Sequence, residues 1–130
     1  MAPLIDALPV GARVVLHSGH AQPPLLAEML AQHAPALHGV QVLATMPMVD
    51  APYASAAALA HLKVESLMPG LGLRQVALAD SVNLLRHTVF DWPALFAHGD
   101  LRAEVLMLQV SPVDADGMVS LGVSVDFMHA

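Results

Sequence analysis

Short apolar runs, each stopped by proline or glycine, constrain the fold of this chain more than any other feature of its sequence. The clearest runs are residues 13–17, 40–45 and 104–110, and apolar residues at helical spacing fill much of the sequence between them. A buried strand of a parallel sheet reads as such a continuous aliphatic run, because helices cover both faces of the sheet. The alternation predicts an α/β fold with a mostly parallel sheet flanked by helices.

The first 45 residues form the clearest unit of this pattern. Pro23 and Pro24 fit the first turn of a helix, where a missing N–H costs nothing, and apolar residues then recur at helical spacing until Pro35. Gly39 separates this helix from the second strand-like run. We therefore expect a βαβ unit with a right-handed crossover.

The remainder of the chain has weaker patterns. They predict helices over residues 55–62, 73–79 and 92–97, and strands over 63–68, 83–89, 104–110 and 118–125. Turn residues at 114–117 make the last two strands a hairpin or a tight excursion between neighbouring strands. Because the sequence stops soon after, with no helix to cover the last run, we expect residues 1–130 to be a single, partial domain, truncated at its C-terminus.

Composition excludes several classes of protein. Of the 130 residues 56% are hydrophobic and only 12% are charged, which is typical of a chain that buries a core and an interface with a partner. The net charge of −6, without a basic cluster, disfavours nucleic-acid binding, and no apolar stretch reaches the roughly 20 residues of a membrane span. No secretory signal is visible, so the cytoplasm is the expected location.

Histidine and cysteine usage disfavours a metal site. The chain has eight histidines, of which His17 with His20, or His33 with His38, could be considered as ligand pairs. Neither pair has the spacing of a His-Glu-x-x-His helix, and cysteine is absent, so no thiolate ligand, disulfide or cysteine nucleophile exists. We expect no metal.

Two further motifs have a structural and a chemical interpretation. Asp114, Asp116 and Gly117 resemble the middle of a calcium loop, but Pro112 and Val123 occupy the positions of its end ligands, so a tight turn is favoured. Ser18 lies between a strand and a helix without the G-x-S-x-G context of a serine nucleophile, and a turn residue is favoured there too. This same junction, at a helix N-terminus, is a candidate site for an anion or a carbonyl oxygen.

A recognisable motif lies at residues 108–126, LQVSPVDADGMVSLGVSVD. It resembles the signature of the acetyl-CoA hydrolase/transferase family, the family I CoA-transferases that include 4-hydroxybutyrate and succinate:acetate CoA-transferases. Members carry Gln-x-Ser-Pro at the end of a strand, then Asp-x-x-Gly, then Ser-Leu-Gly-x-Ser-x-Asp. The matching residues here are Gln109, Ser111, Pro112, Asp114, Gly117, Ser120, Leu121, Gly122, Ser124 and Asp126.

The N-terminal region extends the resemblance to about residues 10–127. Its matching residues are Gly11, Arg13, Val14, Ser18, Gly19 and Pro23, which resemble the family's opening strand and its Gly-Ser-Gly-x-x-x-Pro loop. His17 departs from the pattern because it replaces the first glycine of that loop. Pro69, Gly70 and Arg74 resemble the family's Gly-Pro-x-x-Arg region in altered order.

The resemblance implies the N-terminal domain of a two-domain acyl-CoA transferase or hydrolase. Such enzymes move CoA between carboxylic acids through a glutamate that attacks the acyl thioester, passes through a mixed anhydride and then holds CoA as a glutamyl thioester. The family's nucleophilic glutamate lies in the C-terminal domain. Glu28, Glu65 and Glu104 of this chain do not match it, so no catalytic residue is assigned here.

The same resemblance implies a pocket for acyl-CoA and small carboxylic acids, with CoA as substrate and no permanently bound cofactor. Its expected residues are Ser18, Gly19, Pro23, Gln109, Ser111, Pro112, Gly117, Ser120 and Gly122. Two hypotheses remain. The chain is part of a CoA-transferase that is inactive without the C-terminal domain, or it is a non-catalytic remnant that acts as an interaction or acyl-CoA-binding module. Either way, we expect a homo-oligomer or a complex with a complementary domain or chain.

Overall fold

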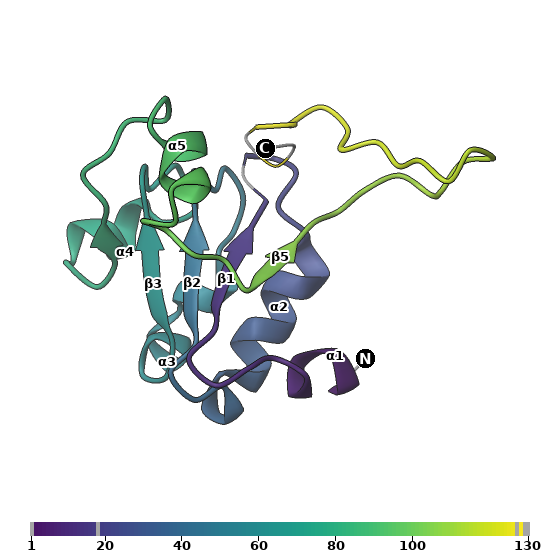
Figure 1. The fold of residues 1–130 in the computed structure, drawn as a ribbon. Coiled ribbons are helices and arrows are strands. Elements are labelled where there is room, and N and C mark those ends of the chain that lie inside the picture. The colour runs from purple at the N-terminus through teal and green to yellow at the C-terminus, as the bar shows by residue number, and fades with distance from the viewer. Residues whose placement is uncertain (1, 18, 127, 129–130) are drawn as a thin grey trace.

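Five short parallel strands form one sheet with the order β4-β3-β2-β1-β5 (Figure 1). A computed structural model describes residues 2–17, 19–126 and 128. The strands are β1 (Arg13–Leu16), β2 (Gln41–Ala44), β3 (Lys63–Ser66), β4 (Asn83–Leu84) and β5 (Val105–Met107). The helices are α1 (Ala2–Asp6), α2 (Pro24–His33), α3 (Ala56–Leu59), α4 (Arg74–Leu78) and α5 (Trp92–Ala97), with 3-10 helices η1 (Ala34–Ala36) and η2 (Pro52–Ala54). The predicted α/β class with a parallel sheet is confirmed.

The first βαβ unit agrees closely with the prediction. β1 pairs with β2 in parallel, with Arg13 opposite Gln41, and α2 begins one residue after Pro23. The inner residues of β1 are fully buried, as the continuous apolar run predicts for a central parallel strand. On α2, Glu28 accepts a hydrogen bond from Gln32 (3.1 Å) on the exposed side of the helix.

The two faces of the sheet have cores of different size. One face packs against α1, α2 and α3 in a large apolar cluster that includes Ile5, Val14 and Leu30. The other face has a small cluster of Val15, Leu43, Trp92 and Leu101, which α5 and the segments beside it cover. Trp92 is fully buried, with the Phe96 ring centroid 6.1 Å from its own.

Several predicted elements in the second half are shorter than expected or absent. The helices at 73–79 and 92–97 and the strand at 63–68 are confirmed, but the helix at 55–62 shrinks to α3 and the strands at 83–89 and 104–110 shrink to β4 and β5. Both of these strands lie at the edges of the sheet, where pairing is available on one side only. The helix α1 was not predicted.

The strand predicted at 118–125 is wrong, and in the described residues after β5 the predicted hairpin is present only as a reversal of the chain without strands. Residues 109–122, here called the arm, extend away from the body of the molecule (Figure 1). The arm pairs with itself: the Ser111 N–H donates to the Ser120 carbonyl (2.9 Å) and the Asp114 N–H to the Met118 carbonyl (2.9 Å). Its alternating apolar residues find no strand partner in the described sheet, so they remain exposed.

None of the helices in the described residues is long and apolar enough to cross a membrane.

A buried polar contact fixes the loop after β2 to the start of α2, and it gives a test of the fold. The Tyr53 hydroxyl donates to Gln22 Oε1 (2.9 Å), while Gln22 Nε2 donates to the Asp50 carbonyl (2.8 Å). Burial raises the pKa of Tyr53 far above its usual range, so its hydroxyl remains a donor.

We expect Tyr53→Phe to lower the free energy of unfolding by about 1–3 kcal/mol, because Gln22 Oε1 would stay buried without a donor. Urea denaturation measures the change. Gln32→Leu, which removes an exposed hydrogen bond, is the matched control and should change stability by less than about 0.5 kcal/mol. Equal losses in the two variants would contradict the assignment.

Candidate functional site

The carboxyl ends of the central strands carry buried polar residues. His17 follows β1, Thr45 follows β2 and Ser66 ends β3, and their exposed fractions are 1%, 4% and 0%. The Ser66 hydroxyl is within hydrogen-bond distance of the carbonyls of Thr45 (3.3 Å) and Met68 (2.9 Å). Ligands of open parallel sheets bind beyond this edge, so it is the first place to look for a site.

Residues 123–126, here called the strap, return across this edge after the arm. His17 Nε2 is hydrogen-bonded to the Ser124 carbonyl, and the Thr45 hydroxyl donates to Asp126 Oδ2 (3.3 Å). Asp126 has a φ of 50°, in the left-handed region that most side chains avoid. The strap is thus hydrogen-bonded to the residues that follow β1 and β2, although these segments are far apart in sequence.

A cavity of about 290 Å³ lies beneath the strap. Its lining residues are Gly19, Thr45, Met46, Leu67, Val89, Trp92, Val123, Ser124, Val125 and Asp126. Between the lining residues Val89 and Trp92 in sequence, the exposed Asp91 carboxylate accepts hydrogen bonds from the backbone N–H of Thr88 (2.8 Å) and from the Thr88 hydroxyl (2.9 Å). These bonds, the backbone one foremost, hold the pKa of Asp91 below its usual value.

A second cavity, of about 330 Å³, lies between the loop after β1 and the base of the arm. Four residues of the predicted CoA pocket line it: Gln109, Ser111, Ser120 and Gly122. His20 and Ala21 form the opposite wall, and Val123 lines both cavities. The arm therefore gathers part of the predicted pocket at the carboxyl edge.

The other predicted pocket residues have different surroundings. Pro23 is buried at the start of α2, and Pro112 and Gly117 line neither cavity. Gly117 belongs to a tight turn in which Asp114 Oδ1 accepts the N–H groups of Asp116 (2.9 Å) and Met118 (2.8 Å). This confirms the turn predicted there. Ser18 lies outside the described residues.

Gly19 lies where the loop after β1 meets both the β2 loop and the strap. Its φ is +61°, and its N–H donates to the Met46 carbonyl (3.0 Å). A Cβ added at Gly19 would lie 3.2 Å from Ser124 Oγ. The turn therefore needs glycine for its backbone conformation and for the close approach of the strap.

Sequence reasoning missed Thr45, Trp92 and Asp126 as site residues, and it treated His17 only as a disfavoured metal ligand and as a departure from a motif. Thr45 could have been found, because it ends a predicted strand at the carboxyl edge of the sheet. Nothing local to Trp92 indicates that it faces the same cavity as the strap, since that contact depends on the tertiary fold.

The three glutamates lie away from both cavities. Arg13, the first residue of β1, ties two of them to the amino end of the sheet: Glu65 Oε2 is 3.2 Å from Arg13 Nη2, and Glu104 Oε2 accepts the Arg13 backbone N–H (2.7 Å). Glu28 is exposed on α2. Among the described residues, no group of three histidine, aspartate or glutamate side chains is placed to hold a metal ion.

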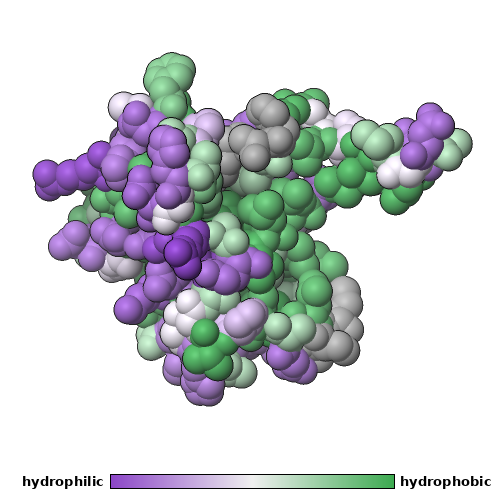
Figure 2. Space-filling view, in the orientation of Figure 1, coloured by the Kyte–Doolittle hydropathy of each residue, from purple (hydrophilic) through white to green (hydrophobic). Residues whose placement is uncertain are grey.

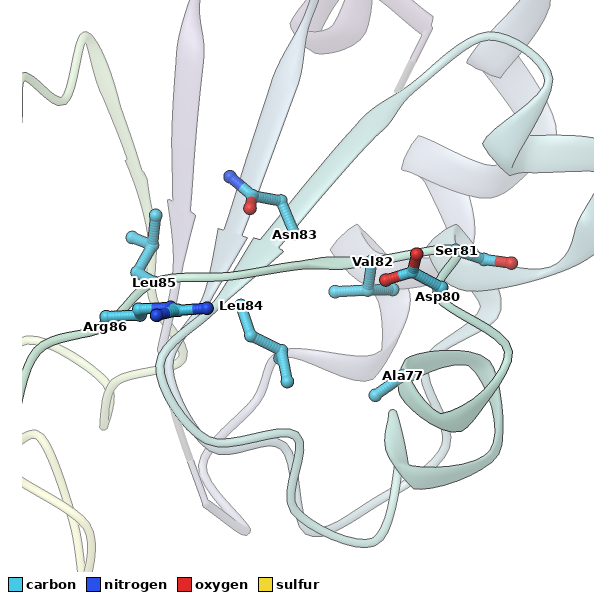
Figure 3. Close-up of a pocket in the computed structure, with 8 residues that line it drawn as sticks. All are labelled: Ala77, Asp80, Ser81, Val82, Asn83, Leu84, Leu85 and Arg86. Carbon is cyan, nitrogen blue, oxygen red and sulfur yellow. The ribbon is translucent and has the colours of Figure 1, made fainter.

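A further hollow, of about 700 Å³, lies beside the edge strand β4. Figure 3 shows Leu84 of β4 and Ala77 of α4 on either side of it, with Asp80 and Arg86 at its rim. The rim residues are exposed. This hollow lacks the buried polar side chains that mark the carboxyl edge.

The fold and the position of the cavities define an α/β domain whose candidate site lies at the carboxyl edge of a parallel sheet. No family model matches the chain. The chain is 27% identical, over 120 residues, to the succinyl-CoA:acetate/propanoyl-CoA:succinate CoA transferase of Fasciola hepatica, covering 92% of this chain and 25% of that protein. The predicted resemblance to a CoA-transferase N-terminal domain is confirmed.

Solved structures share the fold. RipA from Yersinia pestis aligns with a TM-score of 0.79 and 21% identity, covering 93% of this chain and 30% of RipA. A single-residue variant of RipA aligns with a TM-score of 0.82, covering 97% of this chain and 31% of the variant. The chain thus spans about a quarter to a third of the length of the proteins it matches.

The contact between Gly19 and the strap predicts a difference between two alanine substitutions. Gly19→Ala and Gly99→Ala should each cost about 1–2 kcal/mol of unfolding free energy, because both glycines have a positive φ. Gly19→Ala should cost more, because a Cβ at Gly99 meets nothing within 4 Å. Chemical denaturation measures both changes, and adding Ser124→Ala should bring the Gly19→Ala loss down to that of Gly99→Ala. Equal losses in the two single variants would contradict the close approach.

Proposed function

We propose that this chain is the N-terminal part of an acyl-CoA transferase or hydrolase that moves CoA between carboxylic acids. The observation that carries the proposal is the similarity to a CoA transferase over 92% of the chain. The cavity lined by Gln109, Ser111, Ser120 and Gly122 supports it, because these residues come from the motif on which the resemblance rests. In this proposal the carboxyl edge contributes walls of the pocket for acyl-CoA and acid, and the protein works in the cytoplasm.

The chain alone is inactive in this proposal. A covalent transfer needs a carboxylate that can reach the acyl carbon of the thioester. Glu65 and Glu104 are held by Arg13 at the amino end of the sheet, and Glu28 projects from the exposed side of α2. The nucleophile is therefore supplied by a second, glutamate-bearing domain or chain.

A thioester-exchange assay with acetyl-CoA and several acceptor acids tests the proposal. We expect no turnover by the chain alone, and turnover when the chain is combined with a glutamate-bearing domain encoded next to it. Glu65→Gln and Glu104→Gln should leave the activity of the combined protein unchanged. Turnover by the chain alone that disappears in either variant would show that the nucleophile lies in this chain.

The second candidate is a non-catalytic module that binds a partner protein or acyl-CoA. Exposed apolar side chains on the arm favour it, because large exposed apolar patches commonly mark a binding surface. Figure 2 shows apolar surface along the arm and below it, over the region of β5 and α2. Absence of any glutamate-bearing domain encoded nearby, with acyl-CoA or partner binding retained, would favour this candidate.

Both candidates lead us to propose that the arm mediates self-association or docking of a complementary chain. Val113 and Met118 of the arm are 67% and 64% exposed. In light scattering at micromolar concentration we expect a particle larger than the 13.6 kDa monomer. Replacing both residues with lysine should reduce its mass, because burying an unpaired charge in an interface is costly.

A control with the same added charge distinguishes an effect of the arm from an effect of added charge elsewhere on the surface. Val10→Lys combined with Leu78→Lys also replaces two exposed apolar residues, at 81% and 77% exposure, but away from the arm. The control should keep the larger mass. A clean monomer for the unmodified chain would contradict self-association.

A further inference from the structure

The cavity beneath the strap has a mostly apolar wall with one carboxylate in it. Its apolar side chains are those of Met46, Leu67, Val89, Trp92, Val123 and Val125. Trp92 belongs to the core cluster on this face of the sheet, and Leu67 packs against that cluster. The carboxylate is that of Asp126, whose Oδ2 accepts a hydrogen bond from the Thr45 hydroxyl (3.3 Å). A ligand that matches this wall is itself mostly apolar.

No lysine or arginine lines this cavity in the described part of the chain. The sequence has five such residues, and none of them lines the cavity beneath the strap or the one at the base of the arm: Arg13, Lys63, Arg74, Arg86 and Arg102. A carboxylate on a ligand would therefore meet the carboxylate of Asp126 without a cation from these walls. Removing such a charge from water without a partner is costly, and a second negative charge nearby adds to the cost.

The size of the cavity and its neighbour suit a short acyl chain joined to CoA. An apolar cavity of about 150 Å³ is enough to hold benzene, so a cavity of about 290 Å³ has room for a short acyl chain. The second cavity, with Gln109, Ser111 and Ser120 in its wall, offers hydrogen-bonding groups that suit the amides of pantetheine. Val123 lines both cavities, so a thioester held there could place its acyl tail in one and its pantetheine in the other.

We infer that the cavity beneath the strap selects acyl groups with an uncharged tail, such as butanoyl, over acyl groups that end in a second carboxylate, such as succinyl. Asp126 and the absence of lysine and arginine from the described wall determine this choice. The inference rests on the proposed acyl-CoA function and narrows its substrate class to monocarboxylic acids and their CoA esters.

Butanoyl-CoA and succinyl-CoA are matched probes for this inference, because their acyl chains have equal length and differ only in a terminal methyl or carboxylate group. Trp92 is the single tryptophan of the chain and lines the cavity, so its fluorescence reports binding there. In titrations of the chain we expect butanoyl-CoA to bind at least about tenfold more tightly than succinyl-CoA. CoA without an acyl group should change the emission less than butanoyl-CoA does.

Two variants test the electrostatic cause. Val89→Lys adds a cation at an exposed position of the cavity wall, and Asp126→Asn removes the carboxylate with little change of shape at a left-handed φ that asparagine tolerates. Each should reduce the preference for butanoyl-CoA by about threefold or more. Val10→Lys is the matched control, because it adds the same charge at an exposed residue that does not line the cavity, and it should leave the preference unchanged.

The inference is overturned if succinyl-CoA binds as tightly as butanoyl-CoA, if neither ester changes the emission of Trp92, or if Val10→Lys alters the preference as much as Val89→Lys. Should Asp126→Asn fail to fold, Val89→Lys and its control decide.

Thioester exchange by the chain combined with a glutamate-bearing domain distinguishes this inference from the proposed function. Transfer that is faster from succinyl-CoA than from butanoyl-CoA would contradict the inference and leave the proposed function intact. Selective binding of butanoyl-CoA by the chain, without any transfer by the combined protein, would contradict the proposed function alone.

Discussion

The pairing of β1 with strands on both sides is the constraint on which the rest of the structure depends. β1 pairs with β2 from Arg13 to Leu16 and with β5 from Val14 onward, so its inner residues are covered above, below and on both edges. A shift of one residue in this register would move every side chain to the opposite face. It would also separate His17 from Thr45, which the present register places at the same edge of the sheet.

The sheet keeps the glutamates away from the candidate site. Arg13 at the amino end of β1 gathers Gln41, Glu65 and Glu104 around itself, while the carboxyl end offers hydroxyl, imidazole and backbone groups and the Asp126 carboxylate. Ionic groups are least costly where they are paired and partly solvated, as Arg13 and Glu65 are, with 21% and 15% of their side chains exposed. The cavity beneath the strap therefore has the Asp126 carboxylate in its wall but no glutamate.

Local patterns were sufficient for the first half of the fold because each of its elements has a partner along the chain. The runs at 13–17 and 40–45 pair with each other, and Pro24 starts the helix between them. Residues 118–125 alternate between apolar and polar side chains as a strand does, yet they form no strand. The turn at 114–118 leads the arm back on itself and away from the sheet. Alternating periodicity shows that a segment is able to form a strand, but it becomes one only when it pairs with another strand.

The candidate site was predictable only in part, for a related reason. The motif residues Gln109, Ser111, Ser120 and Gly122 are close in sequence, so the arm brings them together by its own turn. The cavity beneath the strap combines residues from positions 19 to 126, and its shape follows from the tertiary fold. Trp92 illustrates the difference, because its sequence neighbours predict a helix but do not tell which strands its ring covers.

The position of the arm connects its exposed surface with the strap. The arm joins β5 to the strap, so a partner that seats the arm fixes the point from which the strap starts, next to Val123 in the wall of both cavities. The strap itself is then held by His17 and Thr45 from within the sheet. If the arm docks a partner as proposed, that partner would fix the strap at one end while the strand ends fix it at the other, so the proposed docking surface and the cavity wall would share one continuous segment of chain.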